Sequence, residues 1–177
     1  RAGTAGRLTL FEGEMDAFAS AVPAGTPRVD AAFNLINTIR HLPDDASMLR
    51  HFEEVAGILT ARGVYLVGLS ITDYDLEQPS EDVWTGARRG LRVTQTVNYL
   101  PATPPDRWET VLSHLHVTGP DRDEHRDSTY RLRTYNLAEW TDLVERSAVR
   151  IEEVLDDAGE PMDPPTMGYG LFVLRPR

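Results

Sequence analysis

The sequence contains no cysteine, which excludes disulfide bonds, thiolate-ligated zinc and a cysteine nucleophile. It also lacks any run of about 18 apolar residues that would predict a membrane-spanning helix, and residues 1–13 lack the apolar core of a secretory signal. Positive charge is the minority sign, with 18 Lys and Arg against 28 Asp and Glu, and the net charge of -10 argues against nonspecific binding to nucleic acid or an anionic membrane. The lack of a membrane span and of a signal core predicts a soluble, cytoplasmic protein, whereas the lack of cysteine does not fix the compartment.

The residues that are present fit a globular protein, because 177 residues can bury a sizeable core and 41% of them are hydrophobic. The clearest element is a helix over Asp44–Leu59, where apolar residues recur at helical spacing and Asp44 or Asp45 can cap the start. Gly63 is suited to a left-handed helix terminus. The near-continuous apolar segment Val64–Ile71 predicts a central parallel strand.

Two shorter strands are predicted before that helix. Arg7–Phe11 ends in an acidic cluster, and Ala31–Leu35 fits a strand that is buried on both faces. Strand, helix and strand over residues 31–71 then form a βαβ crossover.

The pattern changes from Trp84 onward. Three alternating segments, "LRVTQTVNY", "RWETVLSHLHV" and "EHRDSTYRLRTY", are separated by turn residues and predict an antiparallel meander within Trp84–Tyr135. A short helix with Asn136 as its cap and two strands, "VRIEEVLDD" and "GYGLFVLRPR", close the chain. The meander has too few apolar residues for a core of its own, so it must pack on the rest of the chain as a lid or on a second copy as a dimer element. We favour the lid.

This order of elements resembles the C-terminal two-thirds of class I S-adenosylmethionine-dependent methyltransferases. The matching segments are "LFEGEMDAF" with its acidic strand end, "VDAAFNLINTIRHL", "DDASMLRHFEEVAGILTARGVYLVGLSI" and the final helix with two strands. The resemblance implies an α/β, Rossmann-like methyltransferase fold. It has a mostly parallel sheet, a C-terminal antiparallel hairpin and an inserted meander over residues 84–135.

Two features depart from the family pattern. The turn that is usually Pro-Gly-Gly is Thr60–Gly63 here, and the glycine-rich cofactor loop has no counterpart, since "AGTAG" at residues 2–6 precedes a strand instead of following one. We therefore expect residues 1–177 to be one methyltransferase-like domain that is incomplete at its N-terminus, short by about 60 to 80 residues, the size of two βα units. A sheet without its middle strands leaves backbone groups unpaired, so we expect this segment neither to fold nor to be active alone.

The resemblance implies S-adenosylmethionine as the cofactor and places its site at strand ends. Glu14 is expected to accept a hydrogen bond from the adenine amine, or else to be a solvated turn acid. The backbone N–H of Met15 is expected to serve a ring nitrogen. Backbone groups of Asn34 and Leu35 are expected to meet the amino group of the cofactor.

The same strand ends supply the candidate substrate residues, because ligands bind outside the carboxyl ends of parallel strands. Asn37 can reach the substrate or cap a helix. Arg40 can hold a carboxylate as a planar fork, and His41 can act as a base or fix the loop. Asp73 and Tyr74, which follow the central strand, can orient a substrate amine or hydroxyl or serve only the loop.

The meander adds two further candidates. Trp84 is expected to bind substrate as part of an aromatic cover that also includes Tyr99, Trp108 and Tyr130. His114 is a candidate base facing the substrate. His114 and His116 have good metal-ligand spacing, but sequence does not place a third ligand beside them, and we predict no metal.

Methyl transfer needs no protein nucleophile, because the sulfonium is already activated. We therefore predict transfer of a methyl group from S-adenosylmethionine to nitrogen or oxygen of a small-molecule acceptor, such as an amine or a sugar-like compound. The alternative is a non-catalytic interaction or dimerisation module on the same scaffold. A dehydrogenase of the NAD type is disfavoured because the terminal antiparallel hairpin fits it poorly.

Overall fold

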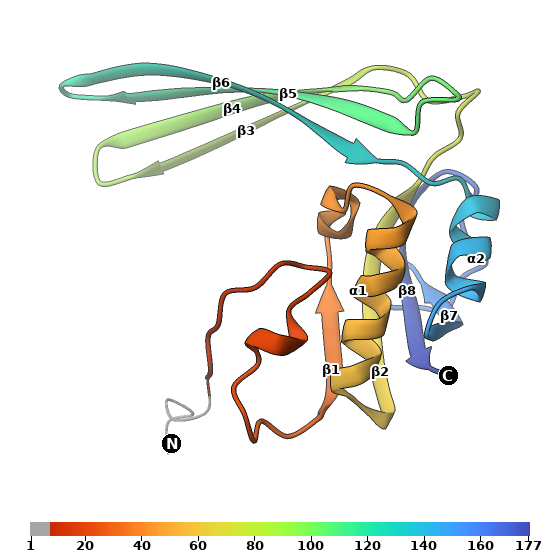
Figure 1. Ribbon diagram of the computed structural model, residues 1–177. Helices are drawn as coiled ribbons and strands as arrows, with labels where there is room; N and C mark the ends of the chain where they lie inside the picture. Colours follow the sequence, from red (N-terminus) through yellow and green to blue (C-terminus); the bar gives the residue numbers. More distant parts are fainter. Residues whose placement is uncertain (1–7) are drawn as a thin grey trace.

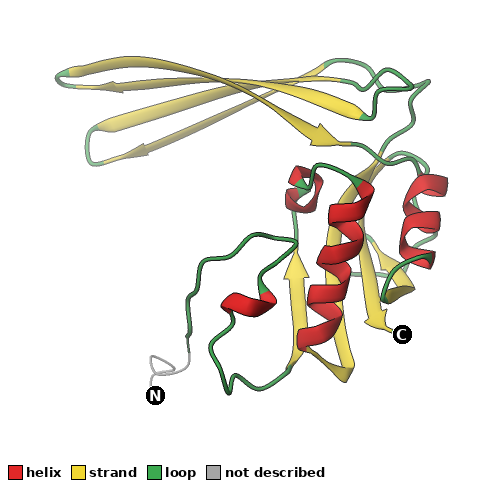
Figure 2. Cartoon of the chain, viewed as in Figure 1, coloured by secondary structure: helices red, strands yellow, loops and turns green. Residues whose placement is uncertain are grey.

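The computed structural model describes residues 8–177, which form an α/β unit and a separate antiparallel sheet that lies across one end of it (Figures 1 and 2). We call the sheet of the α/β unit sheet A and the antiparallel sheet sheet B. Within the described residues, no helix has the length and apolar character needed to cross a membrane.

Sheet A has four strands in the order β1-β2-β8-β7. They are β1 (Val29–Asn34), β2 (Leu59–Ile71), β8 (Gly168–Pro176) and β7 (Val149–Leu155). β1 pairs with β2 in parallel, whereas β8 is antiparallel to both of its neighbours. The terminal antiparallel hairpin and the α/β class are therefore as predicted. The expectation of a mostly parallel sheet is not confirmed, because the described residues form a mixed sheet.

Helix α1 (Asp45–Ile58) connects the two parallel strands. The carboxylate of Asp44 caps it by accepting a hydrogen bond from Ser47 N at 2.7 Å, which confirms the predicted cap. The end of the helix differs from prediction. Leu59 is already extended, with φ -76° and ψ 147°, and the chain continues directly into β2. The prediction of a left-handed terminus at Gly63 is therefore wrong, because Gly63 lies inside the strand.

Helix α2 (Leu137–Glu145) lies beside α1 on the same face of sheet A (Figure 1). Asn136 and Glu139 form a reciprocal capping box at its start, which satisfies two backbone N–H groups that the helix leaves free. Trp140 is fully buried and packs edge-on against Phe52 of α1 and Phe172 of β8. This aromatic contact ties both helices to the sheet.

The strand β1 is more exposed than predicted. Four of its six residues are exposed, and Phe33 has 74% of its surface accessible. The expectation of burial on both faces is wrong, because β1 pairs with β2 on one edge and with no other strand among residues 8–177.

The predicted strand Arg7–Phe11 is not formed over residues 8–11, and Arg7 lies outside the described residues. These residues are irregular, and Leu8 and Leu10 are 80% and 83% exposed. They pair with no described strand, and a strand needs a partner for its backbone groups. The chain then passes through the 3-10 turn η1 (Ala19–Ala21) before β1.

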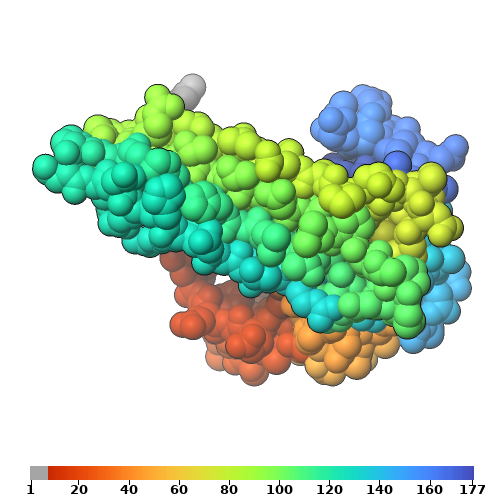
Figure 3. Space-filling view, turned by 90° about the horizontal axis from the view of Figure 1, so that it is seen from above, coloured from red at the N-terminus to blue at the C-terminus, as the bar shows by residue number. Residues whose placement is uncertain are grey.

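Sheet B is a four-stranded meander of β3 (Ser80–Arg88), β4 (Leu91–Leu100), β5 (Trp108–Gly119) and β6 (Arg122–Arg133), with every pair antiparallel. The predicted meander is present, but it has one strand more and begins at Ser80 instead of Trp84. β3 escaped prediction because all nine of its residues are exposed and give little apolar alternation. Seen from above, sheet B crosses the α/β unit and projects beyond it (Figure 3).

Candidate functional site

The loop after β1 is fixed against β2 by the Asn37 side chain. Asn37 Nδ2 donates to Ser70 Oγ at 2.9 Å, and Ser70 N donates to Asn37 Oδ1 at 2.7 Å. Ile36 and Asn37 both have positive φ, 53° and 62°. That conformation suits Asn but is strained for a β-branched residue. Strain of this kind is commonly held at ligand sites, and here it turns the chain sharply into the 3-10 helix η2 (Thr38–His41).

The same loop contacts β8 through the side chain of Tyr169. The Ile36 backbone N–H donates to the Tyr169 hydroxyl at 3.3 Å. That hydroxyl lies over Gly68 of β2, where a Cβ atom would come within 1.8 Å of it. Gly68 is therefore the residue that allows strand, tyrosine and loop to meet.

The four residues predicted to bind the cofactor lie near one another beside the end of β1. Asn34 Nδ2 donates to Met15 Sδ at 3.5 Å, while Asn34 Oδ1 is buried and has no hydrogen-bond partner. Glu14 is exposed next to Met15, and Leu35 follows Asn34 with 37% of its surface accessible. Among residues 8–177, this segment therefore presents one unsatisfied acceptor and one carboxylate without a partner.

His51 of α1 fixes the Met15 segment to the core. Its Nδ1 lies 2.7 Å from the Met15 carbonyl oxygen, which can only accept, so Nδ1 carries the proton. Nε2 then accepts from the Tyr65 hydroxyl at 2.7 Å. Burial lowers the pKa of His51 and raises that of Tyr65, so both groups are neutral at pH 7.

A cleft of about 430 Å³ lies between η2 and sheet B. The end of β2 and the start of β8 form its floor. Its lining residues are Ile36, Asn37, Arg40, His41, Ser70, Glu77, Asp82, Tyr99, Glu109, Tyr130, Leu132, Met167 and Gly168. Three of these are carboxylates, from the loop after β2, from β3 and from β5, and they outnumber the single arginine.

Arg40 joins the two sides of this cleft. Its Nη2 donates to Glu109 Oε2 and its Nε to the Arg133 carbonyl oxygen, both at 2.8 Å. The Arg40 and Glu109 side chains are only 6% and 13% exposed. Arg40 was predicted to hold a substrate carboxylate. In the structure its guanidinium instead forms an ion pair with the Glu109 carboxylate of sheet B, and this contact holds that sheet over η2.

Glu77 is the carboxylate in the cleft whose pKa is raised by its surroundings. Burial raises its pKa, the nearby negative charge of Glu109 raises it further, and Arg40 opposes both effects. A carboxylate with a raised pKa holds protons more readily near neutral pH and is better matched to proton transfer than an ordinary one.

Aromatic side chains from η2 and sheet B also line the cleft. The rings of His41 and Tyr130 face each other across the gap between η2 and β6, with centroids 5.7 Å apart. Tyr99 of β4 lies next to them, and burial raises its pKa. His41 is thus the predicted catalytic residue that the fold brings to the cleft.

Asp73 and Tyr74 lie elsewhere. Together with the first residues of α2 they line a second hollow of about 280 Å³. The Tyr74 hydroxyl donates to Glu139 Oε2 at 2.8 Å, and burial raises its pKa. The Asp73 carboxylate accepts from Asp75 N at 3.0 Å and closes the turn after β2. In the structure, the contacts of Asp73 and Tyr74 hold the loop after β2 in place, and neither residue lines the cleft.

The two candidates on sheet B also lie outside the cleft lining. Trp84 lies two residues beyond Asp82 along β3, on the same side of the sheet, and is 50% exposed. His114 pairs with Asp127, three positions from the Val111–Tyr130 pair. Because side chains alternate along a strand, His114 points to the face of sheet B opposite Tyr130 and the cleft.

No protein-family model matches this sequence, and no curated protein matches it significantly. Solved structures do match. DesVI of Streptomyces venezuelae aligns with a TM-score of 0.71 at 17% identity, over 94% of this chain and 64% of that one. CalS10, an amino pentose methyltransferase from Micromonospora echinaspora, gives 0.67 at 16% identity, over 93% and 63%. The sugar N-methyltransferase KedS8 from Streptoalloteichus gives 0.65 at 17% identity, over 93% and 61%.

The chain has the Rossmann-like fold of class I methyltransferases. It spans a little under two thirds of the length of the structures it matches. On this methyltransferase fold, the cleft and the Asn34 segment lie at the carboxyl ends of the two parallel strands, which is the ligand-binding edge of open α/β sheets.

Sequence reasoning missed the three acids of the methyltransferase-fold cleft, Glu77, Asp82 and Glu109. Glu77 carried a usable signal, since it follows the central strand by a few residues, as Asp73 does. Asp82 and Glu109 carried none, because their position depends on how sheet B folds back over η2.

Proposed function

We propose that this protein takes part in S-adenosylmethionine-dependent methyl transfer to a nitrogen of a small-molecule acceptor. The observation that carries the proposal is the acid-lined cleft, which opens beside the unsatisfied Asn34 carbonyl at the ligand-binding edge of a methyltransferase fold. That CalS10 and KedS8 are named as an amino pentose methyltransferase and a sugar N-methyltransferase supports the same class of acceptor.

The residues beside β1 fit the cofactor. Asn34 Oδ1 is a buried acceptor without a partner, and an ammonium group such as that of S-adenosylmethionine would satisfy it. Glu14 offers an exposed carboxylate for an amine or hydroxyl, and Met15 and Leu35 are its neighbour and that of Asn34 in the sequence. When bound, the cofactor supplies a methyl group activated by its sulfonium. The protein then has to align the acceptor and exclude water.

The cleft fits a cationic amine. Glu77, Asp82 and Glu109 line the cleft together with a single guanidinium, so a positively charged acceptor would balance the site, whereas a carboxylate would be repelled. Tyr99 and Tyr130 give the acceptor a flat wall. Glu77 is the group best suited to take the proton that the amine nitrogen loses, because its pKa is raised. His41 is the second candidate for that role.

Transfer of a labelled methyl group tests this proposal. The intact protein is assayed with a panel of amino sugars and small amines, each paired with its hydroxyl counterpart. We expect amines to be methylated and their counterparts not. Glu77→Gln should lower kcat by about 100-fold or more, while Glu53→Gln on the exposed face of α1 should leave it unchanged. Methylation of hydroxyls but not amines would overturn the choice of nitrogen.

A second role for sheet B, as a dimer element, is favoured by β3. All nine of its residues are exposed and its outer edge is unpaired among the described residues, and a free edge can pair with another chain. Sedimentation analysis of wild type and of Val83→Lys separates the two roles. A dimer that the substitution dissociates supports pairing through β3, whereas a monomer at every concentration supports the lid.

A further inference from the structure

The face of sheet B that points away from the cleft carries a row of histidines and aspartates. Register pairs His116 with His125 directly across β5 and β6, and His114 with Asp127. Asp123 extends the row toward the β5–β6 turn. All five side chains share one face, because directly paired residues and alternate residues of a strand lie on the same side.

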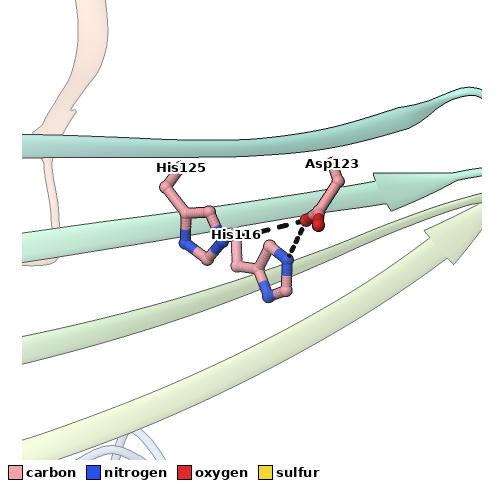
Figure 4. A group of neighbouring side chains, drawn as sticks. All are labelled: His116, Asp123 and His125. Carbon is pink, nitrogen blue, oxygen red and sulfur yellow. Dashed lines mark hydrogen bonds and ion pairs between the residues drawn. The ribbon is translucent and has the colours of Figure 1, made fainter.

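Three of these residues converge on one point. His116 Nε2 lies 2.7 Å and His125 Nε2 lies 3.8 Å from the same oxygen, Asp123 Oδ1 (Figure 4). The two imidazole rings are stacked with centroids 4.1 Å apart and an interplanar angle of 16°. Their donor atoms and the carboxylate oxygen all fall within 4.8 Å of one another. Donor atoms around a tetrahedral zinc ion lie about 3.3 Å apart, given bonds of about 2 Å, and the two measured separations bracket that value.

The protons of His114 and His125 are arranged as a metal site requires. The Asp127 carboxylate can only accept, so His114 Nδ1, at 2.6 Å from it, carries a proton. In the neutral ring His114 Nε2 is then an acceptor, and His125 Nδ1 donates to it at 3.0 Å. This leaves the lone pair on His125 Nε2, the atom that faces Asp123. Ligating histidines commonly donate their other N–H to a partner of this kind, which fixes the tautomer.

We propose that His116, His125 and Asp123 bind a zinc ion through His116 Nε2, His125 Nε2 and Asp123 Oδ1, with water as the fourth ligand. His114 and Asp127 hold His125 in the ligating orientation. Two imidazoles and one carboxylate suit zinc, whereas magnesium and calcium prefer oxygen ligands alone. On binding, the proton on His116 Nε2 is displaced and the ring takes up a proton at Nδ1, so the imidazole stays neutral. Nε2 and Asp123 Oδ1 are then both free to bind the ion.

The site has a structural consequence that is independent of methyl transfer. His116 and His125 lie close to the β5–β6 turn, at the end of sheet B that projects away from the α/β unit (Figure 1). A bound ion would tie β5 to β6 where few apolar contacts do so, since the apolar cluster of sheet B lies toward the opposite end. Loss of the ion should therefore loosen the hairpin and leave the cofactor segment unaffected.

Calorimetric titration of the metal-free intact protein with zinc chloride tests the proposal. We expect one zinc ion per chain with micromolar affinity, and no comparable binding of magnesium or calcium. His116→Asn and His125→Asn should each weaken binding by more than about 100-fold, and His114→Asn by about 10- to 100-fold. His41→Asn, which removes a histidine outside the row, should bind zinc as the wild type does.

The variants are expected to fold, because the His116, His125 and Asp123 side chains are 38%, 54% and 76% exposed. Far-ultraviolet circular dichroism checks this for each variant. Histidine NMR signals give a second readout, in which zinc should shift the resonances of His116 and His125 but not those of His41. Absence of saturable binding at about 100 micromolar zinc, or binding that survives both His116→Asn and His125→Asn, would overturn the proposal.

Discussion

The α/β unit and sheet B are stabilised in different ways. In the α/β unit, two helices bury a continuous apolar cluster against sheet A, with Trp140 between Phe52 and Phe172. The buried apolar cluster of sheet B consists of Val97, Val111 and Leu132, and the outer strand β3 is exposed throughout. The α/β unit thus carries its own core, while sheet B depends on its hydrogen-bonded ladder and on polar contacts to η2. The cleft lies where the two meet.

Truncating a buried side chain of the α/β core should lower the free energy of unfolding most, and the same change in sheet B should lower it less. Trp140→Ala removes the centre of the α/β core and should lower the free energy of unfolding by about 3 to 5 kcal/mol. Leu132→Ala in the small cluster of sheet B should lower it by about 2 kcal/mol, the low end for leucine. Urea unfolding followed by circular dichroism measures both.

Trp140→Phe is the matched control. Trp140 Nε1 is buried without a partner, so phenylalanine loses no hydrogen bond and should retain most of the stability. Equal losses for Trp140→Ala and Leu132→Ala would contradict the difference drawn between the two regions.

Breaking the ion pair between Arg40 of η2 and Glu109 of sheet B should have the next largest effect on the free energy of unfolding. Arg40→Met leaves Glu109 without its partner at 13% exposure, and we expect a loss of about 3 kcal/mol in unfolding free energy, since an uncompensated buried charge is costly. The double variant Arg40→Met with Glu109→Gln should recover part of this loss. If Arg40→Met unfolds at the wild-type urea concentration, the pair does not hold sheet B in place.

Two glycines of the α/β unit, one in β2 and one in α1, should respond to substitution in opposite ways. Gly68→Ala would drive a Cβ atom into the Tyr169 hydroxyl and should destabilise the protein by about 1 to 3 kcal/mol. Gly57→Ala meets nothing within 4 Å and lies inside α1, so it should stabilise the protein by roughly 0.5 to 1 kcal/mol. Thermal unfolding of both variants reports the expected opposite signs.

Acid should weaken the α/β unit through His51. Burial depresses its folded pKa below the unfolded value of about 6.5. Stability is therefore complete above that pH and is lost as pH falls toward the folded pKa, because the unfolded chain binds the proton first. The expected slope approaches about 1.4 kcal/mol per pH unit. Urea unfolding at several pH values should show a shallower slope for His51→Gln than for the wild type.

The same division explains how far the sequence predicted the structure. In the α/β unit, local signals predicted both helices and the central strand, since the Asp44 cap, the Asn136 cap and the apolar segment 64–71 all gave the elements found. The prediction of β1 as a doubly buried strand was wrong because burial depends on neighbours, and Phe33 has none on its outer side.

For the site, the sequence correctly placed the loop after β1 at the cleft, but it did not predict which groups the side chains of that loop contact. Asn37 and His41 were placed at the cleft because they follow a strand end. Arg40 was assigned to a substrate carboxylate, although the carboxylate it meets is Glu109, 69 residues away in the chain. A pairing at that distance depends on how the meander folds back, and no local pattern encodes it.

The central claim is that the end of β1 receives S-adenosylmethionine, and calorimetry with S-adenosylmethionine and S-adenosylhomocysteine on the intact protein tests it most directly. We predict one site per chain. Asn34→Leu, which removes the buried acceptor, should weaken binding by about tenfold or more, the effect of losing one buried hydrogen bond. Asn34→Asp, which keeps the acceptor, should bind nearly as well as the wild type. No heat of binding at about 1 mM of either compound, or equal affinity in all three proteins, would contradict the account.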